Sequence, residues 1–303
     1  MASNKTVVVK KIWENLQHEG EGRRVVYFDD VLKAIEQCNE ADNVKRSKKN
    51  PANFMKDLAR HDNASDNWPK SLAEQRISGR QRVGGNRVFE FIDYAADQTE
   101  PLPNPYYPKP GMAAMPLQSL RLPLASKALG RKDESWLVQV TVALSLLEQH
   151  MATVSKLPVI EVVHLQIGVK LANSEIDSLF RGVLDDGLNE PSHILLTCEA
   201  KQKGERIVDH QIIEQIVAAA KSVQSKTIKD ELNVERIVPI AVKAIGDEGE
   251  VYIAEFEPWT INEALAEESE IKQLTLASEA LYALLPPVPG IGFTKKAPKR
   301  RRA

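Results

Sequence analysis

The first 96 residues carry apolar side chains at helical spacing, followed by runs of β-type residues. Three stretches with this spacing predict short helices, over residues 5–17, 28–39 and 50–61. Two further runs, 75–83 and 87–91, surround a Gly-Gly-Asn turn and predict a β-hairpin. The expected order in this part is therefore three helices and then a hairpin.

The part after residue 123 alternates helical and strand patterns. Helices are expected over 135–153 and 209–224. Strands are expected over 159–171, 174–180, 193–202, 234–246 and 250–257. The order of helix, three strands, helix and two strands favours long helices packed on a mixed sheet, which is an α/β arrangement.

A proline-rich stretch lies between the two parts. It contains Pro101, Pro103, Pro105, Pro108, Pro110, Pro116 and Pro123. Proline removes backbone donors and disfavours helix at the preceding residue, so the stretch is expected to be a semi-rigid linker. The predicted domains are 1–96, the linker 97–123, a second domain 124–290 and a basic tail 291–303, which is a candidate for nonspecific DNA affinity.

Composition and charge narrow the class of protein. The longest apolar runs, such as 237–242, are too short to span a membrane, and the first residues lack the apolar core of a secretion signal. Two cysteines, Cys38 and Cys198, provide neither a disulfide framework nor a four-ligand zinc set, which favours a reducing, cytoplasmic setting. The segment from Lys45 to Arg87 contains eleven Lys/Arg and four Asp/Glu, although the whole chain has a net charge of −2. Such a basic segment is expected of a polyanion-binding surface. A solvated basic face would have the same composition.

The stretch with the clearest chemistry is the predicted strand that ends in Glu199-Ala200-Lys201. Glu199 and Lys201 are two residues apart and therefore share one face of the strand. Asp177 lies on the preceding predicted strand, which can pair with it as a hairpin. Two carboxylates can hold Mg²⁺, for which Mn²⁺ is a substitute, and a lysine beside them can act on a phosphodiester. A surface hairpin with a Glu–Lys ion pair is the simpler alternative.

These residues resemble the PD-(D/E)XK nuclease superfamily, which includes many restriction endonucleases. The pattern is Glu-Ile-Asp177 followed by an apolar strand ending Glu199-Ala200-Lys201, with Ile176 where the name-giving pattern has proline. The resemblance implies a restriction-endonuclease-like core in which Asp177 and Glu199 bind metal and Lys201 is the catalytic lysine.

The resemblance also implies supporting residues on the flanking helices. Many members have a glutamate on the helix before the first strand, for which Glu148 is the candidate and Glu134 the alternative. Gln211 fits the polar position on the following helix. Glu175 points to the same face as Asp177, two residues away, and remains an alternative metal ligand.

The N-terminal order of three helices and a hairpin resembles a winged-helix DNA-binding domain. In the third helix, Phe54, Met55 and Leu58 form the apolar stripe, so the polar positions between them project outwards. The candidate DNA-binding residues are Lys48, Lys49, Asn53, Lys56, Arg60, Arg80 and Arg82. For each of them singly, the alternative is a solvated surface residue.

Together these features predict a site-specific, Mg²⁺-dependent endonuclease for double-stranded DNA, of the kind found in type II restriction systems. A palindromic site would favour a homodimer, because two active sites must reach two strands. The alternatives are a nonspecific or structure-specific repair or defence nuclease, and a DNA-binding regulator with an inactive nuclease-like domain.

Overall fold

The computed structural model describes residues 3–18, 22–41, 51–82, 86–171, 174–224, 233–246, 249–266 and 274–292. The chain forms two compact units. The N-terminal unit comprises Met1–Pro105 together with Gly204–His210, and the C-terminal unit comprises Tyr106–Lys203 together with Gln211–Ala303. The division after Pro105 falls inside the proline-rich stretch. The inclusion of residues 204–210 in the N-terminal unit was not expected from the sequence.

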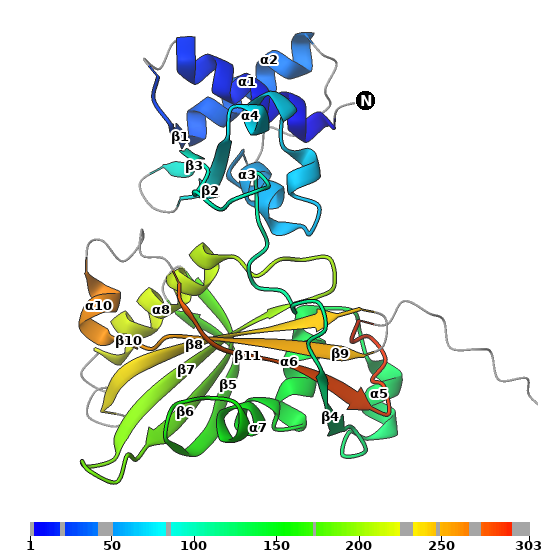
Figure 1. The fold of residues 1–303 in the computed structure, drawn as a ribbon, viewed down its shortest axis with the longest axis vertical. Helices are drawn as coiled ribbons and strands as arrows, with labels where there is room; N and C mark the ends of the chain where they lie inside the picture. The colour runs from blue at the N-terminus through cyan, green and yellow to red at the C-terminus, as the bar shows by residue number, and fades with distance from the viewer. Residues whose placement is uncertain are drawn as a thin grey trace, which may run out of the picture. The chain divides into compact units, whose positions relative to one another are not determined.

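The N-terminal unit contains the three predicted helices and the two predicted hairpin strands (Figure 1). Its elements are α1 (Asn4–His18), β1 (Val25–Tyr27), α2 (Phe28–Ala41), α3 (Pro51–Arg60), a 3₁₀ turn (Ser65–Asn67), α4 (Lys70–Glu74), β2 (Ile77–Gln81) and β3 (Arg87–Asp93). The strands form an antiparallel sheet in the order β1-β3-β2. Three residues of β1 are too few for a recognisable alternation, so the pattern did not predict it.

An aromatic core holds this unit together. Phe89 and Phe91, from alternate positions of β3, pack edge to face at 5.7 Å, and Trp68 lies 5.8 Å from Phe91. The Trp68 indole nitrogen donates to the Ile77 carbonyl at 2.9 Å, so the ring is buried without an orphaned donor. Gly79 lies against this core, and a larger residue does not fit there because its Cβ would collide with the Phe89 ring.

The C-terminal unit is built on one mixed sheet of eight strands. Its helices are α5 (Leu124–Leu129), α6 (Glu134–Ala143), α7 (Leu146–Thr153), α8 (Asp209–Val223) and α10 (Ile261–Leu265). Its strands are β4 (Ala114–Gln118), β5 (Val159–Leu171), β6 (Ser174–Leu184), β7 (Ser192–Lys201), β8 (Val234–Ile245), β9 (Glu250–Phe256), β10 (Trp259–Thr260) and β11 (Leu276–Leu285). The strand order is β4-β11-β9-β8-β7-β6-β5, and β10 pairs with β8.

The predicted α/β class is confirmed at the level of a large mixed sheet with helices, and several elements differ from expectation. The helix expected over 135–153 is two helices, because Ser145 takes a left-handed conformation with φ 53° and breaks the run. Strand β4 lies within the proline-rich stretch and pairs in parallel with β11, so part of that stretch is not a linker. Pro116 is tolerated there because β4 is an edge strand.

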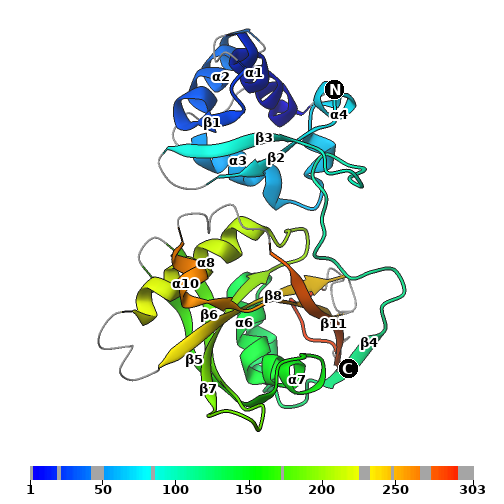
Figure 2. The ribbon, with the colours of Figure 1, turned by 60° about the vertical axis from the view of Figure 1, so that its left-hand side comes forward.

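Helices cover both faces of the central strands (Figures 1 and 2). Leu137 and Val140 of α6 and Leu147 of α7 pack in one apolar cluster with Leu196 and Cys198 of β7. The alternate residues of β7 point to the other face, where α8 packs. Strand β7 is consequently buried along most of its length. β7 and β8 are parallel, and α8 forms the crossover connection between them. The end of β7 is buried from solvent.

Two smaller findings bear on the class of protein. Cys38 and Cys198 are both buried. Within the part of the chain that the structure describes, no helix has the length and apolarity needed to cross a membrane.

Candidate active site

The candidate site lies where β6 and β7 pair near the end of the sheet. Their antiparallel register places Ser178 opposite Cys198, so Asp177 and Glu199 are the next residues along the two strands. The Asp177 carboxylate also accepts a hydrogen bond at 2.8 Å from the Ala200 backbone nitrogen. The predicted hairpin thus brings two carboxylates from adjacent strands together at one point.

Lys201 is the most enclosed charged group of the site, with 1% of its surface exposed. Its Nζ lies 2.5 Å from Glu199 Oε1 and donates to Glu134 Oε1 at 2.8 Å. Burial alone would lower the pKa of Lys201, but the charges of Glu199 and Glu134 more than offset it, so its pKa lies above the usual value. The lysine is therefore a buried cation held between two carboxylates.

The position of Glu134 follows from local sequence. It is the first residue of α6, directly after Asp133, whose side chain caps the helix by accepting from the Trp136 backbone nitrogen at 2.9 Å. Gln202, the residue after Lys201, donates from its side chain to the Asp133 carbonyl at 2.7 Å. The start of α6 is thereby fixed against the end of β7.

Glu199 is held from the opposite side by α8. Its Oε2 accepts a hydrogen bond from the Gln215 amide, which also donates to the Glu175 carbonyl at 3.1 Å. Gln215 is itself 2% exposed. Both oxygens of Glu199 therefore have partners, and its orientation is determined by residues from β7 and α8 together.

The negative charges of Asp177 and Glu199 repel each other, and Lys201 only partly offsets this repulsion. Burial, and next the charge of Glu199, raise the pKa of Asp177 to about 7. Burial, and next the charges of Asp177 and Glu199, raise the pKa of the Cys198 thiol, which makes it a poor nucleophile. Excess negative charge beside the buried Lys201 is a favourable setting for a divalent cation.

The donor set suits Mg²⁺. Asp177 and Glu199 offer hard carboxylate oxygens, and Mg²⁺ typically takes only one or two carboxylates and keeps several waters. Within the described ranges, no group of three or more His, Cys, Asp or Glu side chains that could hold a metal ion is found.

The supporting residues differ from those expected. Glu134, the alternative candidate, contacts Lys201, whereas Glu148 lies on α7, where burial raises its pKa and its Oε2 has no hydrogen-bond partner. Gln215 contacts Glu199, whereas Gln211 stands one turn earlier on α8 with its Oε1 unpaired. A buried glutamine inside the apolar stripe of α8 is the signal that could have identified Gln215. The Glu175 side chain is exposed, and only its carbonyl takes part.

The candidate DNA-binding residues lie in two settings. On α3, Phe54, Met55 and Leu58 are buried as predicted, while Asn53 and Lys56 are exposed and Arg60 is half-buried. In the hairpin, Arg80 and Arg82 both face Glu90, with Nε to Oε2 distances of 2.8 and 3.4 Å. The Arg82 side chain is only 15% exposed. Lys48 and Lys49 lie outside the described residues.

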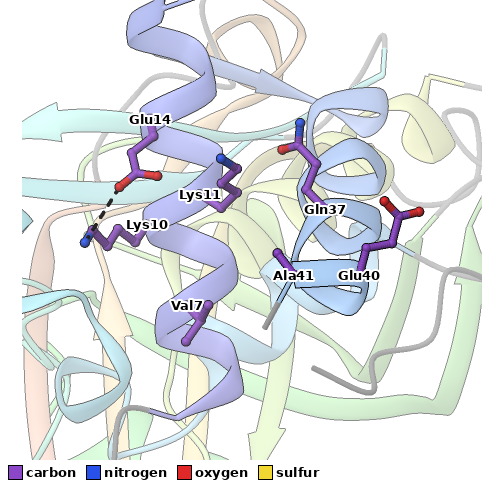
Figure 3. Close-up of a pocket in the computed structure, with 7 residues that line it drawn as sticks. All are labelled: Val7, Lys10, Lys11, Glu14, Gln37, Glu40 and Ala41. Atoms are coloured by element: carbon purple, nitrogen blue, oxygen red, sulfur yellow. Dashed lines mark ion pairs between the residues drawn. The ribbon is translucent and has the colours of Figure 1, made fainter. Parts of the chain in front are cut away.

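A hollow of about 700 Å³ in the N-terminal unit is separate from this site (Figure 3). It lies between α1 and α2 and is lined by Val7, Lys10, Lys11, Glu14, Gln37, Glu40 and Ala41. Its lining mixes both signs of charge, with Lys10 and Glu14 paired at 3.7 Å on the solvent-exposed side of α1. It offers no convergent set of chemical groups comparable with the cluster at the end of β7.

Comparison of the chain with protein-family models, with curated proteins and with solved structures gave no match. The assignment of a function therefore depends on the geometry of the site.

Proposed function

We propose that this chain is a Mg²⁺-dependent endonuclease that cuts double-stranded DNA at specific sites. In this proposal the C-terminal unit is a restriction-endonuclease-like core of the PD-(D/E)XK kind. The observation that carries it is the buried cluster in which Asp177 and Glu199 stand on paired strands and Lys201 lies 2.5 Å from Glu199. A surface hairpin with an ordinary ion pair would not bury a lysine to 1% exposure.

The residues divide the chemistry among them. Asp177 and Glu199 would hold Mg²⁺, which when bound lowers the pKa of a coordinated water and stabilises charge on a phosphate oxygen. Lys201 remains protonated and can donate to an oxygen of the scissile phosphate as negative charge develops there. Glu134 keeps Lys201 charged, and Gln215 orients Glu199. These two are positioning residues.

In the same proposal the N-terminal unit is a winged-helix-like DNA reader. Its order of helices and hairpin supports this, as does the polar outer face of α3, with Asn53 and Lys56 exposed. Side chains on an exposed helix can enter the major groove, where Asn and Arg recognise adenine and guanine edges. Lys48, Lys49, Arg80 and Arg82 would then contact phosphates, and a homodimer would cut both strands of a palindromic site.

Digestion of a long plasmid tests the proposal. Discrete fragments are expected with Mg²⁺ or Mn²⁺, and binding without cutting is expected with Ca²⁺, which activates water poorly. Cutting in EDTA would overturn the metal assignment. A smear with Mg²⁺ would indicate a nonspecific or structure-specific nuclease, and retardation of the DNA without cutting would indicate a regulator with an inactive nuclease-like domain.

A further inference from the structure

The segment that follows the catalytic strand belongs to the N-terminal unit. β7 ends at Lys201 and α8 begins at Asp209, and Gly204–His210, which contains most of the connector between them and the first two residues of α8, groups with Met1–Pro105. The chain therefore joins the two units at three points, after Pro105, after Lys203 and after His210.

Backbone hydrogen bonds attach the connector to the end of α3. The Asp62 nitrogen donates to the Gly204 carbonyl at 3.0 Å, and the Arg206 nitrogen donates to the Arg60 carbonyl at 2.8 Å. His61 and Glu205 form an antiparallel bridge between these two bonds. The residue whose carbonyl accepts, Arg60, is itself one of the candidate base-contacting residues of α3.

The Arg206 side chain anchors the connector in the same unit. It is 3% exposed, and its Nη2 donates to the Leu102 carbonyl at 2.7 Å. Leu102 belongs to the apolar core that α3 also contacts through Met55 and Leu58. Arginine is almost never so enclosed unless its charge and donors have partners. The connector is therefore held by a built contact and does not lie loosely on the surface.

We infer that Arg206 is a positioning residue that makes DNA cleavage depend on engagement of α3 with its target sequence. This inference rests on the proposed function. Only two residues, Gln202 and Lys203, separate Lys201 from Gly204, and three Cα–Cα steps span at most about 11 Å. A shift of the α3 end on DNA binding therefore reaches the end of β7 with little slack. Misplacement of a catalytic group by 1 Å can cost roughly a hundredfold in rate.

Plasmid cleavage by Arg206→Ala separates this role from a simple contribution to binding. We expect kcat with Mg²⁺ to fall about ten- to a hundredfold. KM, and the Kd measured with Ca²⁺ on a fragment of the same plasmid, should change less than about threefold, since the α3 surface is kept. Arg206→Lys should restore most of kcat, because lysine can still donate to the Leu102 carbonyl. Arg24→Ala is the matched control, because it removes an arginine of the same unit that pairs with Asp93 at 2.9 Å, away from the connector.

Gly204→Ala covers the case in which Arg206→Ala does not fold. Gly204 has a φ of +89°, and an added Cβ would meet no atom within 4 Å, so alanine there disturbs only the connector backbone. It should lower kcat without changing Kd. Unchanged kcat in the folded variants, or a loss confined to Kd, would overturn the inference while the proposed function stands. A wild-type chain that cuts no DNA would overturn both.

Discussion

Two regions of the molecule pair lysine or arginine with glutamate, one in a buried position and the other at the surface. At the end of β7, Lys201 is 1% exposed and the Glu199 side chain 6%. In the β2–β3 hairpin, Arg80 is 45% exposed beside Glu90 at 19%. Burying the Lys201–Glu199 pair costs desolvation free energy that apolar residues in its place would avoid. The exposed Arg80–Glu90 pair has a small desolvation cost and contributes little to the stability of the fold.

The difference shows which charges require a functional explanation. Both regions look alike as charge patterns in the sequence, and the hairpin is the more basic of the two. Burial separates them, because burying a cation is costly and buried charges with perturbed pKa values concentrate at functional sites.

Removal of the buried cation should have the largest effect. Lys201→Ala is expected to reduce Mg²⁺-dependent cleavage by roughly 10²–10³-fold or more, because stabilisation of the phosphate charge is lost. DNA binding in Ca²⁺ should stay within about threefold, since the group acts mainly in the transition state. Single-turnover cleavage and gel retardation measure the two quantities. Loss of specific binding by a folded variant would instead make Lys201 a structural or DNA-reading residue.

Glu134 and Glu148, on neighbouring helices, offer a matched test of the residue that positions Lys201. Glu134→Gln keeps the hydrogen bond to Lys201 but removes a negative charge, which lowers the pKa of the lysine, and kcat should fall about ten- to a hundredfold. Glu148→Gln changes a glutamate of the neighbouring helix that makes no such contact, and its kcat should stay within about twofold. Equal effects in the two variants would contradict the placement of Glu134.

The raised pKa of Asp177 predicts how stability without metal depends on pH. Folded Asp177 keeps its proton up to about pH 7, whereas unfolded aspartate loses it near pH 4, so the free energy of unfolding falls as pH rises through this window. Asp177→Asn should remove that fall and be more stable than the wild type at pH 8 in EDTA, by about 1–4 kcal/mol. Urea unfolding at pH 5 and pH 8 measures it.

The wild type provides the control for this experiment. Mg²⁺ should narrow the difference at pH 8, because a cation bound to the folded site offsets the repulsion. A gap between variant and wild type that is the same at both pH values would exclude a titrating Asp177 as its cause.

The smallest effect is expected in the hairpin. Glu90→Gln releases Arg80 and Arg82 from their shared carboxylate, and an exposed pair of this kind holds about 0–1 kcal/mol. Nonspecific DNA affinity should rise about two- to fivefold, with a steeper salt dependence. Titrations at two salt concentrations measure both. Unchanged affinity would indicate that the hairpin does not meet the phosphate backbone.

The local features of this protein follow from its amino-acid pattern. Period-two alternation placed Glu199 and Lys201 on one face of a strand, and helical spacing buried Phe54, Met55 and Leu58. It also indicated that Asp177 could pair with the same strand. These outcomes depend on neighbours within a few residues or on one hairpin, and backbone geometry alone fixes them.

Only the tertiary structure decided which distant residues complete the site. The sequence favoured Glu148 over Glu134, whereas in the structure the break at Ser145 and the cap at Asp133 set the start of α6 and its Glu134 against Lys201. Gln215 replaced Gln211 because the packing of α8 on β7 selects one turn of the helix. The attachment of Arg206 to the N-terminal unit had no local signal. Each of these contacts spans a long stretch of chain, and their choice depends on how complete elements pack.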